Sequence, residues 1–315
     1  MTVSKVEEDT FRYTGLDVKI VSEGIKIPME DYSKSLKEIK EIRKTDDRNE
    51  PLTKLEMKMY RKMTGKIAWL ANSTRPDLCF QALQMSKKNQ GAVMSDLRDV
   101  NRILKRVQER ESKIKYGYIG EKEDLVIIGL GDASYKQDDK AVGGVVLFLA
   151  NSTFTRASPI YWKSKQIERV CHSSKDAETL NLVRMVDDAV LAARQLEMLL
   201  YGDILQRIPI YLFTDSESTL ESVASSKQIS TKTLRNVISD LKQRLVDGEV
   251  TSYAWLSTSD MWADILTKEM KMPPAFENVI LRNDLFLGNT SINRVMAFGQ
   301  EIRMVNIRNR TSTSV

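Results

Sequence analysis

Histidine and cysteine are scarce in this 315-residue sequence, which holds one histidine and two cysteines. A single histidine, His172, argues against catalysis by a histidine pair or triad. The cysteines, Cys79 and Cys171, lie far apart and match no zinc-ligand spacing. They also form no disulfide framework, so we expect a reducing, intracellular compartment.

Long apolar runs are absent as well. No stretch is long enough to span a bilayer, and the N-terminus carries no secretory signal, so we expect no membrane partner. The length and the ordinary share of hydrophobic residues, 42%, are typical of a globular chain that folds as two domains or as one domain with a smaller companion.

Positive charge is concentrated in one segment. Between Pro51 and Lys122 there are 16 Lys and Arg against 7 Asp and Glu, whereas from Leu125 to the C-terminus the count is 22 against 22. Such a segment is either a solvated helical face or a surface that follows nucleic-acid phosphates, and both interpretations stay open. The candidate contacts to nucleic acid are Lys62, Lys66, Arg98, Arg102, Lys105 and Arg106.

The N-terminal third predicts a β-hairpin followed by a basic helical module. Alternation and two glycines over Phe11–Met29 indicate the hairpin. Helices are expected at 29–44, 52–71, 75–88 and 94–110, with a polar linker at 45–53. Thr53 and Glu56 have the spacing of a capping box.

From Leu125 the pattern changes to α/β, in the order βββαβααβα. Strands are expected at 125–132, 141–150, 158–164, 208–215 and 251–257. A long helix is expected at about 176–201, and the last one at 260–270. These patterns divide the chain into residues 1–32, 33–122, 123–275 and a weakly patterned, frayed tail at 276–315.

Two apolar strands end on aspartates, Asp132 and Asp215. Asp132 is either a turn cap or a metal ligand. Sites in α/β sheets lie at the carboxyl ends of strands, so Asp132 and Asp215 could meet. Glu178 shares the buried stripe of the long helix with Leu182, whereas Asp176 points away as a helix N-terminal charge.

The fourth acid, Asp264, begins the last predicted helix, where an aspartate is common without a functional role. Asp260 fits the same description and is better placed as an N-cap. Four inward-pointing acids without a histidine base suggest carboxylates neutralised by divalent cations. Hard oxygen ligands suit Mg²⁺, and two such ions can stabilise the attacking and leaving oxygens of a phosphodiester.

This arrangement of elements and acids is similar to ribonuclease H. The local motifs resemble those of the Pol polyprotein of copia-type LTR retrotransposons, and the resemblance covers about residues 10–275. In chain order the motifs are "GDASY", "PIYWKSKQIERV", "SSKDAETLNL", "FTDSES", "TLRNVISDLKQRLVDGEV" and "WADILTK". Upstream, "EPLTKLEMKMYRKMTGKIAWLANSTRPDL" resembles the reverse-transcriptase thumb, and "FRYTGLDVKI…GIKIPMEDY" the strands that close the palm.

The resemblance implies a mixed five-stranded ribonuclease H-like sheet preceded by a palm remnant (1–32) and a thumb-like helical module (33–122). It assigns metal binding and catalysis to Asp132, Glu178, Asp215 and Asp264. Asp132 would bridge two Mg²⁺ ions, with Mn²⁺ as a substitute, and the reaction would be hydrolysis of the RNA strand of an RNA–DNA hybrid. Partners would be such a duplex and the reverse-transcriptase palm or other Pol and Gag products, in the cytoplasm, within a virus-like particle, or in the nucleus.

The sequence departs from the family at three points. The polymerase aspartates upstream of the thumb are absent, so no polymerase activity is expected. The usual "STEAEY" is "SKDAET" here, which keeps the glutamate, and the loop that carries a histidine in many cellular enzymes has no counterpart. A non-catalytic nucleic-acid-binding or scaffold protein with the same fold is the alternative. A transposase or integrase is disfavoured because its glutamate comes late in the domain.

Overall fold

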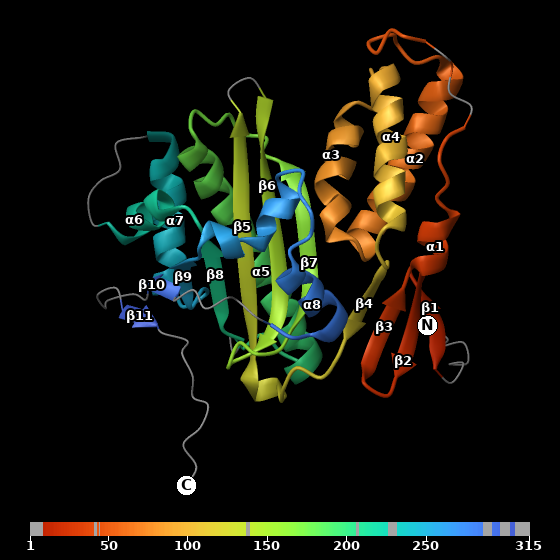
Figure 1. Cartoon of the computed structure of the whole chain (residues 1–315). Helices are drawn as coiled ribbons and strands as arrows, with labels where there is room; N and C mark the ends of the chain where they lie inside the picture. Colours follow the sequence, from red (N-terminus) through yellow and green to blue (C-terminus); the bar gives the residue numbers. More distant parts are fainter. Residues whose placement is uncertain are drawn as a thin grey trace. The chain divides into compact units, whose positions relative to one another are not determined.

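Two compact units make up the chain (Figure 1). The computed structural model describes residues 9–40, 43, 45–136, 139–205, 208–225, 232–285, 292–296 and 303–305. The N-terminal unit is Met1–Tyr118 with Lys268–Met272 and Ile280–Asn283. The C-terminal unit is Ile119–Thr267 with Pro273–Val279 and Asp284–Val315. Among the described residues, no helix is long and apolar enough to cross a membrane.

An antiparallel four-stranded sheet opens the N-terminal unit. Its strands, in spatial order, are β1 (Thr10–Tyr13), β2 (Leu16–Val21), β3 (Gly24–Pro28) and β4 (Lys113–Tyr116). The hairpin predicted over this region is confirmed, but β4 was not predicted. The turn residue Gly24 has φ +131°, and a Cβ there would lie 2.1 Å from the Tyr116 carbonyl oxygen. Glycine therefore allows both the turn and the close approach of β4.

Helices fill the chain between β3 and β4. They are α1 (Glu30–Ser35), α2 (Lys54–Ser73), the 3₁₀ turn η1 (Pro76–Leu78), α3 (Cys79–Lys87) and α4 (Met94–Gln108). The expected face of α4 is buried, with Leu97, Val100 and Leu104 at most 1% exposed. The helix predicted over 29–44 is wrong beyond Ser35, because Leu36 takes an extended ψ of 93°. Residues 41, 42 and 44 of that prediction lie outside the described residues.

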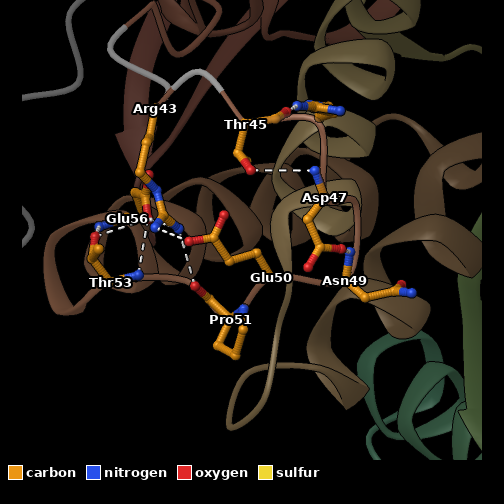
Figure 2. Close-up of polar contacts among 9 residues, drawn as sticks. Arg43, Thr45, Asp47, Asn49, Glu50, Pro51, Thr53 and Glu56 are labelled. Carbon is orange, nitrogen blue, oxygen red and sulfur yellow. Dashed lines mark hydrogen bonds and ion pairs between the residues drawn. The ribbon is translucent and has the colours of Figure 1, made fainter.

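A network of charged and polar side chains connects the segment before α2 to the start of that helix (Figure 2). Thr53 accepts from the backbone N–H of Glu56, and the Glu56 carboxylate accepts from the Thr53 N–H at 2.8 Å, which confirms the capping box. Arg43 pairs with Glu50 and Glu56 and donates to the Pro51 carbonyl at 3.1 Å. The polar linker is thus tied to the helix that follows it.

A buried arginine joins the helices of the N-terminal unit. Arg75, 2% exposed, forms two hydrogen bonds with the Asp77 carboxylate, at 2.9 and 3.0 Å. It also donates to the Val107 carbonyl at 3.0 Å and to the Ser112 hydroxyl at 3.3 Å. Arg75 thereby satisfies a carbonyl left unpaired at the C-terminal end of α4.

A mixed sheet forms the core of the C-terminal unit, in the spatial order β11-β10-β9-β8-β5-β6-β7. Strand β5 pairs antiparallel with β6 and parallel with β8, which is itself parallel to β9. The five predicted strands are neighbours in the spatial order β9-β8-β5-β6-β7, which confirms the predicted ribonuclease H-like fold, and β10 and β11 extend the sheet beyond β9. The strands of this sheet are β5 (Leu125–Lys136), β6 (Asp139–Asn151), β7 (Ala157–Gln166), β8 (Ile210–Thr214), β9 (Ser252–Trp255), β10 (Ile292–Met296) and β11 (Arg303–Val305).

Opposite faces of this sheet are covered by different segments. Gly143 and Gly144 are successive residues of β6 and therefore face opposite sides of the sheet. A Cβ added to Gly143 would contact Asn181 of α5 (Ser174–Tyr201), whereas a Cβ added to Gly144 would contact Leu266. Helix α5 and the segment with Leu266 therefore lie on opposite faces (Figure 1). The 3₁₀ turn η2 (Lys122–Asp124) precedes β5, while α6 (Glu217–Ala224) and α7 (Lys232–Val246) connect β8 to β9.

The end of the sequence departs from two expectations. The predicted helix at 260–270 is instead two 3₁₀ turns, η3 (Thr258–Asp260) and η4 (Trp262–Leu266), which are separated at Met261 with ψ 82°. The predicted tail begins with helix α8 (Pro274–Arg282) rather than with frayed chain. Phe276 of α8 is fully buried and stacks on Trp262 with 5.6 Å between ring centroids.

Candidate metal centre

Three predicted acids converge at one edge of the mixed sheet. Each of Asp132, Glu178 and Asp215 offers a carboxylate oxygen, and these oxygens lie within 4.8 Å of one another. The strand register explains part of this arrangement. Leu130 of β5 pairs with Phe213 of β8, so both aspartates follow two residues after this parallel pair. The parallel register of the two strands thus brings Asp132 and Asp215 to the same place, just beyond the last paired residues.

Asp132 is held inside a strand rather than at a strand end. Strand β5 continues to Lys136, and Asp132 faces Gly144 of β6, so the turn-cap interpretation is wrong. The Asp132 side chain accepts a hydrogen bond from the Thr267 hydroxyl, and the two residues are 2% and 1% exposed. Burial of a carboxylate is costly unless polar groups compensate for it, and Thr267 supplies one of them.

Glu178 reaches the same site from the first turns of α5. Its Oε1 accepts from the backbone N–H of Ala133 at 3.1 Å, so the helix side chain contacts the strand directly. Asp176, by contrast, is 7% exposed and accepts from the backbone N–H of His172 at 2.9 Å. Asp176 therefore acts at the helix N-terminus, as expected, but it is buried rather than pointing to solvent.

Asp215 is oriented by two residues that follow β8 in the sequence. The Thr258 hydroxyl donates to Asp215 Oδ2 at 2.9 Å, and the Trp255 indole N–H donates to the Asp215 carbonyl at 3.1 Å. The sequence analysis did not single out Thr258 or Thr267, although Thr267 lies within the quoted motif "WADILTK". What identifies both threonines is a hydroxyl that donates to an acid distant in sequence. Such a contact can be recognised only in the folded chain.

Asp264 lies outside the group of three carboxylates defined by the 4.8 Å distance. It is 8% exposed on η4, and its carbonyl accepts from the Thr267 backbone N–H at 3.1 Å. Asp264 therefore shares a short segment with the residue that holds Asp132. Asp260 ends η3 instead of capping a helix, so the N-cap predicted for it is wrong. The assignment of Asp264 as a metal ligand stays a prediction.

The three converging carboxylates fit a divalent cation. At about 4.8 Å and an effective dielectric constant of about 20, two full negative charges repel by roughly 3 kcal/mol. Threonine hydroxyls and a backbone amide donate to these acids but carry no full positive charge. Mg²⁺ prefers carboxylate oxygens as ligands and commonly keeps several of its waters, so a small number of carboxylates is enough to bind it.

The six basic residues predicted to contact nucleic acid differ in their surroundings. Arg102 and Lys105 are exposed on α4, and their closest acids, Asp99 and Glu38, lie at 3.4 and 4.0 Å. Arg106 instead pairs with Glu269 at 3.2 Å and donates to the Met270 carbonyl at 3.1 Å. The guanidinium of Arg106 therefore has a structural role within the N-terminal unit.

The remaining three lie on α2 and α4. Lys62 is exposed and Lys66 is half-buried, and both line the same surface groove beside residues 35–40. Arg98 is exposed, and one of its guanidinium nitrogens donates to the Thr45 carbonyl at 2.5 Å. Two lysines of α2 are thus available to a partner that binds along this groove.

Comparisons with known proteins give matches among solved structures. The N-terminal RNase H domain of a Mycobacterium tuberculosis protein, solved as a fusion with maltose-binding protein, is 16% identical and matches over 45% of this chain and 91% of its own, with TM-score 0.35. LC11-RNase H1 isolated from compost is 15% identical over the same shares, with TM-score 0.34. No protein-family model and no curated protein matches the chain.

A viral structure matches over a longer part of the chain. The foamy viral protease–reverse transcriptase in complex with RNA/DNA hybrid is 12% identical, and the match covers 79% of this chain with TM-score 0.41. The match covers 29% of that viral chain.

Proposed function

We propose that the C-terminal unit is a divalent-metal-dependent ribonuclease that hydrolyses the RNA strand of RNA–DNA hybrids. The observation that carries this proposal is the convergence of Asp132, Glu178 and Asp215 within 4.8 Å where the parallel pairing of β5 with β8 ends. These three residues would hold Mg²⁺, or Mn²⁺ in its place, and Asp264 would complete the ligand set. When bound, the ions supply an activated water and charge stabilisation for the leaving 3′ oxygen.

The residues of the chain have separate tasks in this proposal. Asp132 is fixed within β5 and Asp215 directly after β8, while Glu178 is contributed by α5 and accepts a hydrogen bond from the Ala133 backbone N–H. Thr267 and Thr258 orient the two aspartates through their hydroxyl groups. The proposal assigns no role as a base to the single histidine, His172, which precedes α5 and donates its backbone N–H to Asp176.

The N-terminal unit would add affinity for the duplex. Lys62, Lys66, Arg98, Arg102 and Lys105 would contact phosphates without reading base sequence. Together with the quoted motifs, this arrangement supports the proposal that the chain is a piece of a copia-type Pol polyprotein. Residues 1–32 would then be the remnant of a palm, residues 33–122 a thumb-like module, and the missing palm a partner.

A cleavage assay tests the proposed activity. A 5′-labelled RNA–DNA hybrid is incubated with the full chain and MgCl₂, beside matched RNA–RNA and DNA–DNA duplexes. We expect cleavage of the hybrid alone, loss of cleavage with EDTA, and loss in Glu178→Gln. Asp176→Asn is the matched control on the same helix, because asparagine accepts a hydrogen bond at a helix N-terminus about as well as aspartate. Binding of the hybrid without cleavage would instead support the non-catalytic alternative.

A further inference from the structure

A single peptide group beside the metal centre is held on both sides by α5. The peptide bond between Asp132 and Ala133 offers one carbonyl and one N–H. Asn181 Nδ2 donates to the Asp132 carbonyl at 2.9 Å, while Glu178 Oε1 accepts from the Ala133 N–H at 3.1 Å. Glu178 and Asn181 are three residues apart on the helix, so their side chains lie on the same face.

Asn181 also ties this peptide to the neighbouring strand. The same Nδ2 donates to the Gly144 carbonyl at 2.9 Å, and Gly144 is the β6 residue directly opposite Asp132. One amide group therefore connects α5, β5 and β6 at the level of the acid. The position of the Asp132 main chain relative to Glu178 is thus set by the helix as well as by the sheet.

The surroundings of Asn181 are shaped to admit its amide. A Cβ on Gly143 would lie 2.1 Å from Asn181 Oδ1, and a Cβ on Gly131 would lie 3.2 Å from Asn181 Nδ2. Any larger residue at 143 would displace the amide. The space for Asn181 is therefore created by glycines on two adjacent strands.

The amide is retained at an energetic cost. Asn181 is 2% exposed, and its Oδ1 makes no hydrogen bond within the described part of the chain. A buried acceptor without a donor is destabilising, so packing alone would favour an apolar side chain here. The two bonds made by Nδ2 account for an asparagine at this position.

We propose that Asn181 is a positioning residue that fixes Asp132 relative to Glu178 and thereby sets the affinity of the site for divalent cations. This inference rests on the proposed function, because it assumes that the carboxylates bind an ion. Residues that orient metal ligands through hydrogen bonds affect ion affinity without touching the ion.

The test uses the full chain and measures Mn²⁺ binding by isothermal titration calorimetry with MnCl₂ alone. We expect Asn181→Ala to weaken Mn²⁺ binding about 10-fold. Hydrogen exchange of the peptide containing Ala133 should become faster in the same variant without metal. The double variant Asn181→Ala/Gly143→Ala refills the space with a methyl group but restores no hydrogen bond. It should therefore recover thermal stability while Mn²⁺ binding stays weak.

The outcomes separate two kinds of failure. Unchanged Mn²⁺ affinity in Asn181→Ala, or affinity restored by the double variant, would overturn the role of Asn181 alone. An Asp132→Asn variant serves as the reference for the site itself. If the parent chain binds no Mn²⁺, or binds it as well after Asp132→Asn, the proposed metal centre fails and the positioning role fails with it.

Discussion

The hydroxyl of Thr267 should contribute substantially to the stability of the C-terminal unit. Thr267→Val keeps the shape of the side chain but removes the donor to Asp132 Oδ2. Both residues are at most 2% exposed, so solvent has little access to replace the missing bond. A hydrogen bond to a charged group contributes about 1.5–3 kcal/mol. We therefore expect the free energy of unfolding of the C-terminal unit to fall by about 2 kcal/mol in the absence of metal.

The assay is urea unfolding followed by tryptophan fluorescence, because three of the four tryptophans lie in the C-terminal unit. Thr267→Ser is the matched control, since it keeps the hydroxyl and removes only a methyl group. We expect the serine variant to be the more stable of the two and to cleave hybrid at close to the parental rate. The reasoning is refuted if the valine variant is as stable as the parent while the serine variant is destabilised. Position 267 would then act through methyl packing rather than through the Asp132 carboxylate.

Three further predictions concern other parts of the chain. Asp264→Asn should slow hybrid cleavage strongly at saturating Mg²⁺ with little effect on folding, whereas Asp260→Asn should reduce the cleavage rate only slightly. The reverse order of cleavage rates would show that Asp260, rather than Asp264, is the functional acid. Arg102→Ala/Lys105→Ala should weaken duplex binding and reduce the slope of log affinity against log salt by about two, because each substitution removes one cation that neutralises a phosphate; an unchanged slope would show that this face is only solvated. Arg75→Met should destabilise the N-terminal unit by about 3–5 kcal/mol, because it leaves a buried carboxylate unpaired; hydrogen exchange across α4 measures this, and unaltered protection would contradict it.

Features governed by neighbouring residues could be predicted from the sequence. The capping box of Thr53 involves residues three apart, and the buried stripe on α4 follows helical periodicity. The meeting of Asp132 and Asp215 was predictable because parallel strands share an edge. Glu178 was identified from its place on the apolar face of the long helix, and its contact with Ala133 agrees with that choice.

Features that depend on distant partners could not be predicted. Strand β4 is short, and no tight turn connects it to its partner β3, because the helical segment lies between them in the sequence. The segment around Asp264 carries a helical pattern, but the backbone at Met261 interrupts it and leaves 3₁₀ turns. The hydrogen bonds of Thr267 and Asn181 join residues that only the fold brings together.

The pairing of β3 with β4 affects how the N-terminal unit can be shortened. Ile25 pairs with Tyr116 and Ile27 with Ile114, so the strands before and after the helical segment of this unit are hydrogen-bonded to each other. A shortened chain that begins at residue 33 would leave β4 without its neighbour and expose an unpaired edge, which favours association between molecules. During synthesis, β4 can likewise pair with β3 only after the whole helical segment between them has been made.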